Sequence, residues 1–261
     1  MLKEVVLQKI GGRYMEKDFL SYDTLERKII SYISKGRDFF KNNNIHKAFS
    51  MFDKALELNN DYAEIYLAKG EAYIEMCDIS SAEKCIKKYI RISNDTFKGY
   101  LNMIEIYIMS DDFDKALVFC DKLISQNKAN YMVYYKKAYV LVQLGKVFDA
   151  LKCYDKCIAL NENFYEAYCN KGELLIGLCM HDEALNTYSK AITIDNDNCE
   201  AYIGKALVYL DMGDYKSAFP LAKKAYKLEP DNNWCKCYYT IIKDTINRQS
   251  KSEGNILFPF E

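Results

Sequence analysis

Residues 131–164, YMVYYKKAYVLVQLGKVFDALKCYDKCIALNENF, decide the fold, because their pattern recurs on both sides at a fixed step. Positions 4, 7, 8 and 11 of this stretch have the spacing of one helix face, and positions 20, 24 and 27 give a second face. Turn formers lie between the two faces, at Gly145 and Lys146. The stretch therefore predicts two antiparallel helices, A and B.

A step of 34 residues carries this pattern along most of the chain without a gap. The six registers are 29–62, 63–96, 97–130, 131–164, 165–198 and 199–232. Position 4 is always tyrosine: Tyr32, Tyr66, Tyr100, Tyr134, Tyr168 and Tyr202. Position 20 is always alanine: Ala48, Ala82, Ala116, Ala150, Ala184 and Ala218. One helix pair cannot bury its apolar stripe alone, so the pairs are expected to stack into a continuous core.

The combination of an aromatic residue at position 4, a small one at 8, an aromatic or Leu at 11, Ala at 20 and an apolar residue at 24 resembles the tetratricopeptide repeat. The resemblance covers 204 of the 261 residues. It implies an all-α fold, a right-handed superhelical α-solenoid of antiparallel helix pairs. Position 7 departs from the family, because it is Lys in every register but one, where Met103 stands. A Lys stem can lie along the core edge while its ammonium group reaches water.

Residues 1–28 precede the repeats and do not share their pattern. Asp23 and Glu26 have the spacing of a capping box, which predicts that the first A helix starts near Thr24. Residues 1–22 are compatible with a short helix or with a disordered arm. Since the N-terminus shows no apolar stretch typical of a signal peptide, we expect a cytoplasmic protein.

The C-terminal residues fall into two parts. Residues 233–247 keep a helical pattern and are expected to form the capping helix that covers the end of a solenoid. The tail, 248–261, turns from polar to apolar and is expected to be disordered. The alternative is that its apolar residues, from Ile256 to Phe260, dock in a groove of this chain or of a neighbouring copy, which would make an oligomer possible.

Composition argues against several classes of function. The chain has 36 basic and 37 acidic side chains, whereas proteins dedicated to nucleic acids usually carry a basic excess. No stretch approaches the apolar length of a membrane span, so no membrane insertion is expected. His46 and His181 lie four repeats apart along the stack and cannot form one site, so we predict no enzyme, no catalytic residues and no cofactor.

Ten cysteines are scattered through the helical pattern. They are Cys77, Cys85, Cys120, Cys153, Cys157, Cys169, Cys179, Cys199, Cys235 and Cys237. Without a signal peptide, free thiols that act as small buried hydrophobes are expected. The pair Cys153 and Cys157, or Cys235 with Cys237, would each need two more ligands to hold a metal, so no metal site is predicted.

The resemblance implies that a second face of the A helices, at positions 2, 5, 6, 9, 12 and 13, lines a concave groove that takes partner segments. The predicted groove residues are Leu67, Glu71, Leu101, Asn102, Glu105, Tyr135, Lys136, Tyr139, Asn170, Glu173 and Ile203. Position 5 is apolar and would form the groove floor, unless it packs against the neighbouring repeat. The amides suit a peptide backbone, the tyrosines give stiff contact area, and the glutamates favour basic side chains.

The predicted function is therefore a scaffold or adaptor for another protein. The guest would be an extended or helical segment with apolar anchors and some Lys or Arg. A chaperone for exported or assembling subunits would use the same groove with looser specificity. A self-associating structural protein is the third possibility, and RNA binding is disfavoured because the inner face is mixed and partly acidic.

Overall fold

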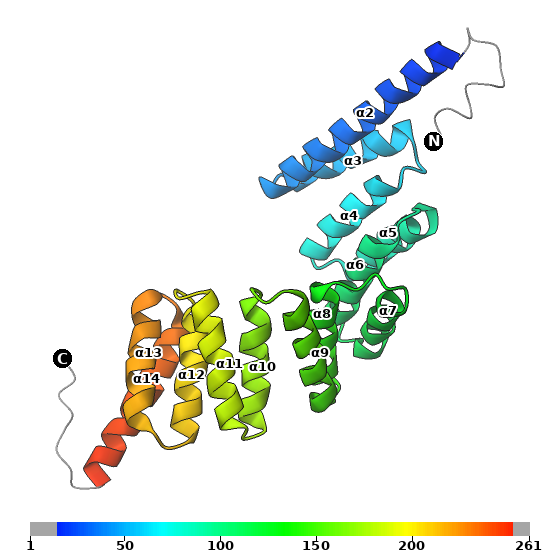
Figure 1. Ribbon diagram of the computed structural model, residues 1–261. Coiled ribbons are helices and arrows are strands. Elements are labelled where there is room, and N and C mark those ends of the chain that lie inside the picture. The colour runs from blue at the N-terminus through cyan, green and yellow to red at the C-terminus, as the bar shows by residue number, and fades with distance from the viewer. Residues whose placement is uncertain (1–14, 253–261) are drawn as a thin grey trace. The chain divides into compact units, whose positions relative to one another are not determined.

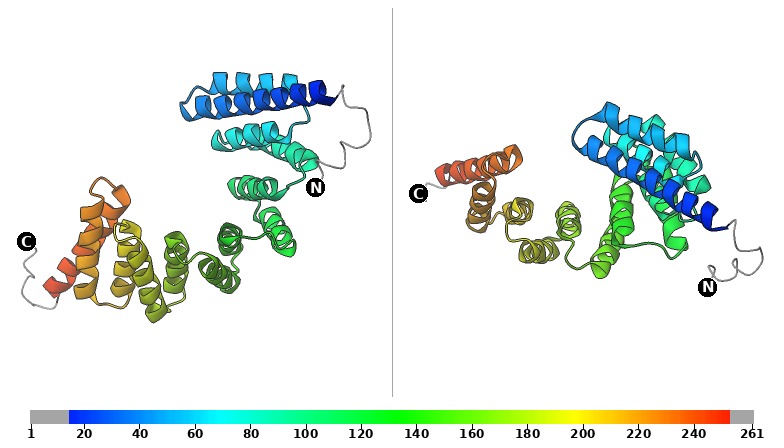
Figure 2. Two further views of the ribbon diagram at one scale, coloured as in Figure 1. Left: turned by 45° about the horizontal axis from the view of Figure 1, so that its top comes forward. Right: turned by 90° about the horizontal axis from the view of Figure 1, so that it is seen from above.

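The computed structural model describes residues 15–252, and the side chains of residues 24–248 (Figure 1). Every regular element in this part of the chain is an α-helix, which confirms the predicted all-α class. The helices fall into two compact units, of which the first ends at Leu123 and the second begins at Ile124. Within each unit, consecutive helices lie side by side and run antiparallel (Figure 2).

The first unit contains three helix pairs. They are α2 (Met15–Lys41) with α3 (Ile45–Leu58), α4 (Ala63–Glu75) with α5 (Ile79–Ile92), and α6 (Phe97–Met109) with α7 (Phe113–Ser125), whose last two residues extend past Leu123. The positions that carry the pattern form the core: Phe52 and Ala48 on α3 are fully buried, and Ile65 on α4 packs into the same cluster.

The second unit contains three further pairs and one single helix. They are α8 (Tyr131–Gln143) with α9 (Val147–Leu160), α10 (Tyr165–Gly177) with α11 (His181–Ile194), α12 (Cys199–Asp211) with α13 (Tyr215–Leu228), and α14 (Asn233–Ser252). The helix α14 covers the apolar side of α12 and α13, where Cys235 and Ile242 are fully buried against Ala218 and Ala222.

The same type of turn connects the two helices in each of the six pairs. The residue at position 15 has a left-handed backbone each time: Asn43 (φ 56°), Cys77 (58°), Asp111 (55°), Gly145 (72°), Cys179 (56°) and Gly213 (75°). The next residue donates its N–H to a carbonyl five residues back, at 2.8 to 2.9 Å in every turn. This is the Schellman closure of a helix. Since an L side chain in this region costs roughly 1–2 kcal/mol, the four turns without glycine are held by their surroundings.

Three of the lysines at position 7, which depart from the family pattern, bind side chains of the preceding repeat. Lys69 Nζ lies 2.8 Å from Asp53, and Lys171 Nζ lies 2.6 Å from Asp155, so each ammonium is bound rather than only hydrated. Lys205 Nζ donates to Ser189 Oγ at 2.9 Å in the same geometry. Each partner stands at position 25 of the preceding repeat, so these contacts join successive repeats.

Glycine allows one especially close approach in the second unit. A Cβ atom on Gly204 would lie 2.2 Å from Cε1 of Tyr188, and one on Gly172 would lie 2.6 Å from the same ring. The Tyr188 ring is therefore wedged between α10 and α12, and only 4% of the residue is exposed.

Both ends differ from the prediction. The helix α2 begins at Met15, well before Thr24, because residues 15–22 contain no Gly or Pro. The helix α14 continues to Ser252, past the predicted end at residue 247 and into the segment expected to be disordered. Residues 1–14 and the apolar tail within 253–261 lie outside the described part, so the docking of that tail stays a prediction. None of the described helices is long and apolar enough to cross a membrane.

Candidate partner-binding site

The second unit has a pocket of about 550 Å³ between its A helices α10 and α12 and the N-terminal part of α14. Aromatic side chains form much of its wall: Tyr165, Tyr188, Trp234 and Tyr238. Tyr188 is buried, while Trp234 is 41% exposed and packs edge-on against Tyr238 with ring centroids 4.9 Å apart. Such a wall offers large, stiff contact area to a guest.

The charge of this pocket has one sign. Glu173, Glu200 and Glu229 line it, and none of the described residues that line it is Lys or Arg. Protein atoms crowd the Glu200 carboxyl although its side chain reaches solvent, and this desolvation is the main cause that raises its pKa above the ordinary value. The negative charges of Glu173 and Glu166 raise the pKa further. A cation in the pocket would relieve this repulsion.

A hydrogen bond joins two predicted groove residues on α8 and α10. Asn170 Nδ2 donates to Tyr135 Oη at 3.0 Å, and both side chains are half-buried. The Tyr135 ring also packs edge-on against Phe164, with centroids 5.0 Å apart. Part of the Asn170 amide is therefore used within the fold. Tyr139 remains 39% exposed, and Glu173 is also exposed.

In the first unit, the predicted groove residues are less available to a guest. Glu71 accepts a hydrogen bond from Arg37 at 2.8 Å, which neutralises its charge. Leu101, Asn102 and Glu105 on α6 are half-buried. A second pocket, of about 410 Å³, lies against α4 and α5 and has both acidic and basic residues in its wall.

The apolar groove floor predicted at position 5 is not open where it was expected. Leu67 is 2% exposed and Ile203 is fully buried. Cys169 and Ile33 occupy the same position and are buried as well. Cys169 and Ile203 belong to core clusters that include residues of the neighbouring helices, so Ile203 offers no surface to a partner. Leu67 is nearly buried but lines the second pocket.

Other pocket residues were missed from the sequence. Glu200 stands at position 2 of its repeat, a position assigned to the groove face, and Glu64 and Glu166 are its equivalents. Trp234 and Tyr238 are positions 2 and 6 of a seventh register that begins at residue 233. Continuing the step of 34 into the capping helix would have found them.

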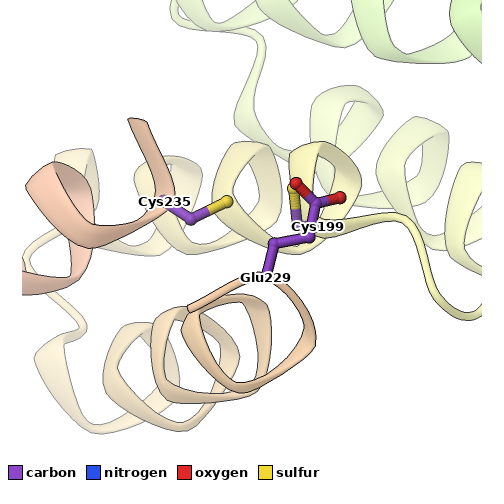
Figure 3. A group of neighbouring side chains, drawn as sticks. All are labelled: Cys199, Glu229 and Cys235. Atoms are coloured by element: carbon purple, nitrogen blue, oxygen red, sulfur yellow. The ribbon is translucent and has the colours of Figure 1, made fainter. Parts of the chain in front are cut away.

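Two thiols and a carboxylate meet beside this pocket. Sγ of Cys199, Sγ of Cys235 and a carboxylate oxygen of Glu229 all lie within 4.8 Å of one another, and the side chains point toward a common centre (Figure 3). Both cysteines are buried, whereas Glu229 is exposed. Cys199 starts α12, Glu229 directly follows α13, and Cys235 lies in the first turn of α14. This grouping was not predicted, because Cys199 and Cys235 are far apart in the sequence.

Comparison with known protein families gives one consistent result. Models of the tetratricopeptide repeat match residues 39–103, 133–164 and 200–232, and a model described as TPR repeat matches 181–213. Together these matches cover more than half of the chain. No curated protein matches the chain by sequence.

Solved structures share the fold at low sequence identity. The chain is similar to YrrB, described as a TPR protein with an unusual peptide-binding site, with 23% identity, a TM-score of 0.56, and coverage of 70% of this chain and 95% of YrrB. It is similar to Pseudomonas aeruginosa pilF, with 15% identity, a TM-score of 0.69, and coverage of 85% and 99%. Yeast Tom70 gives 21% identity and a TM-score of 0.67, with coverage of 85% of this chain and 47% of Tom70.

Proposed function

The chain belongs to the tetratricopeptide repeat family, and on that premise we propose that it is a protein-binding scaffold whose second unit binds a basic segment of a partner. The observation that carries the proposal is the pocket of about 550 Å³, whose wall combines aromatic rings with three carboxylates and no cation among the described lining residues. A Lys or Arg side chain would be attracted by the carboxylates and could stack on the exposed Trp234 ring.

Fewer of the groove residues predicted from the sequence contact the partner on this view. The proposed site keeps Glu173 and Tyr139, which are exposed on the A helices, and adds Glu200 and Trp234. Lys136 is half-buried and does not line the pocket, and Leu101 belongs to the first unit and is not part of this site. Among the structural relatives, the peptide-binding site named for YrrB supports a segment as the guest, although the low identity carries only the fold. A cytoplasmic location stays part of the proposal and agrees with the ten cysteines, all within the described residues, none of which forms a disulfide.

The test compares two peptides of the same length and apolar content, one rich in Lys and Arg and the other rich in Glu. Fluorescence anisotropy with the purified full chain should show binding of the basic peptide only, and the affinity should fall as salt rises. Glu173→Gln combined with Glu200→Gln should weaken binding about tenfold or more, because two carboxylates of the wall are lost.

The matched control changes carboxylates outside the pocket. Glu183 is exposed on α11 and does not line the pocket. Glu183→Gln combined with Glu57→Gln gives the same net charge as the pocket variant and should bind like the wild type. Equal weakening by both double variants would mean that the attraction depends only on net charge, and the proposed pocket would be wrong.

A further inference from the structure

We propose that Cys199, Glu229 and Cys235 form a binding site for a divalent cation of the zinc type on the wall of this pocket. Their ligand atoms already lie within 4.8 Å of one another (Figure 3). Ligands around one tetrahedral zinc ion are roughly 3.3–3.8 Å apart, because each sits about 2.0–2.3 Å from the metal. Only small side-chain adjustments would bring the three atoms onto one ion.

The chemistry of the donor set selects the class of metal. Two thiolates and one carboxylate suit Zn²⁺, whereas Mg²⁺ and Ca²⁺ prefer oxygen ligands throughout. Three protein ligands leave the fourth tetrahedral position free. Cys199 and Glu229 also line the pocket, so water or a donor atom of a bound guest could fill that position.

A neighbouring amide holds two of the ligands in place. Asn232 Nδ2 donates to Glu229 Oε2 at 2.6 Å and lies 3.9 Å from Cys199 Sγ. Its Oδ1 accepts from the backbone N–H groups of Trp234 at 2.9 Å and Cys235 at 3.3 Å, which starts α14. Second-shell partners of this kind orient metal ligands in known sites.

The charge around the cluster also favours a cation. In the part of the chain that the structure describes, no Lys or Arg forms an ion pair with Glu229, whose carboxylate is hydrogen-bonded to Asn232 and Cys199. Zinc binds the thiolate form of cysteine, so the ion would displace the proton of each thiol. Binding would therefore release two protons to solvent and replace them with one divalent ion.

Core packing alone is the competing explanation, since buried cysteines are common as small hydrophobes. It accounts for the two thiols. On that explanation, the position of the Glu229 carboxylate rests on its hydrogen bonds with Asn232 and Cys199 alone. The two explanations differ in what a metal titration shows.

The experiment titrates the reduced, full-length protein with Zn²⁺ by calorimetry and with Cd²⁺ by the ultraviolet band of the cadmium–thiolate bond. The wild type should bind one equivalent tightly. Cys235→Ser and Glu229→Gln should each weaken that equivalent about tenfold or more. The matched control is Cys237→Ser, which removes an exposed thiol from the same helix and should keep the tight equivalent.

Thermal unfolding gives a second readout. Zn²⁺ should raise the melting temperature of the wild type and of Cys237→Ser, because the ion binds the native state and ties α12 to α14. Glu229 is exposed, so Glu229→Gln is expected to fold even if a change at a buried cysteine impairs folding. Equal Zn²⁺ and Cd²⁺ binding by wild type, Glu229→Gln and Cys235→Ser would overturn the site. These outcomes do not depend on which partner segment the pocket binds.

Discussion

Gly204→Ala should destabilise the second unit, because the new methyl group would occupy space that Tyr188 already fills. The added Cβ would lie 2.2 Å from Cε1 and 2.3 Å from Cζ of that ring. Ordinary contact begins at 3.4 Å, so the ring would have to move by about 1.2 Å. It has little room to do so, since Gly172 lies close to it as well and the residue is 4% exposed.

Two opposing effects set the size of the change. Alanine favours a helix by roughly 1 kcal/mol over glycine. Overpacking a tight core costs about 1–3 kcal/mol, and this case belongs near the upper end because two ring atoms are overlapped. We expect a net loss of about 2 kcal/mol in the free energy of unfolding. For a chain of this length, the melting temperature would fall by roughly 4–8 °C.

Gly177→Ala provides the matched control. Gly177 ends α10 in the same unit, and a Cβ there would meet no atom within 4 Å. This variant should gain up to about 1 kcal/mol, since only the helix preference changes. Urea unfolding followed by circular dichroism measures both variants. If Gly204→Ala proves as stable as Gly177→Ala, the wedged ring does not limit the packing and the reasoning fails.

Four further predictions concern single side chains. Burial and neighbouring carboxylates raise the pKa of Glu200, so ionisation of this group destabilises the fold as pH rises from the ordinary pKa through the raised one. In urea unfolding, the free energy of unfolding of Glu200→Gln should exceed that of the wild type by less than about 1 kcal/mol at pH 7 and match it near pH 4. Phe52→Ala should lose about 3–5 kcal/mol by thermal unfolding because Phe52 is fully buried, whereas Phe148→Ala, at a residue that is 68% exposed, should change by less than about 0.5 kcal/mol. Cys179→Gly should raise the free energy of unfolding in urea by roughly 1 kcal/mol or less, because glycine adopts the left-handed backbone of this residue without strain. Asp155→Asn should lower the free energy of unfolding by about 0.2–1 kcal/mol in low salt and by less in high salt, because it removes the partner of Lys171 in the following repeat.

The sequence alone predicted the helix pairs and their stacking, because these depend on spacing within one strip of side chains. Tyr188, Phe52 and Ala218 are buried as the repeated pattern requires. The ends of the helices were harder to predict from the sequence. Asp23 and Glu26 have the spacing of a capping box, yet α2 runs through them because residues 15–22 contain no Gly or Pro.

The site was predicted only in part, for a physical reason. Whether position 5 faces a groove depends on how closely adjacent pairs approach, and the pattern within one repeat does not contain that distance. Ile203 is therefore part of the core, whereas Leu67 is nearly buried but lines the second pocket. The approach of Cys199 to Cys235 likewise arises from stacking α14 on α12 and has no signal in local spacing.

The left-handed turn at position 15 bears on how such a chain can lengthen. Each hairpin is closed by hydrogen bonds of its own backbone, at the same two places, whether the residue is Asn, Asp, Cys or Gly. A duplicated segment of 34 residues would contain the hydrogen bonds that form its own turn and would need none from the segments on either side. Gene duplication or deletion in whole periods should thus preserve folding, whereas an insertion of a few residues inside a hairpin should not.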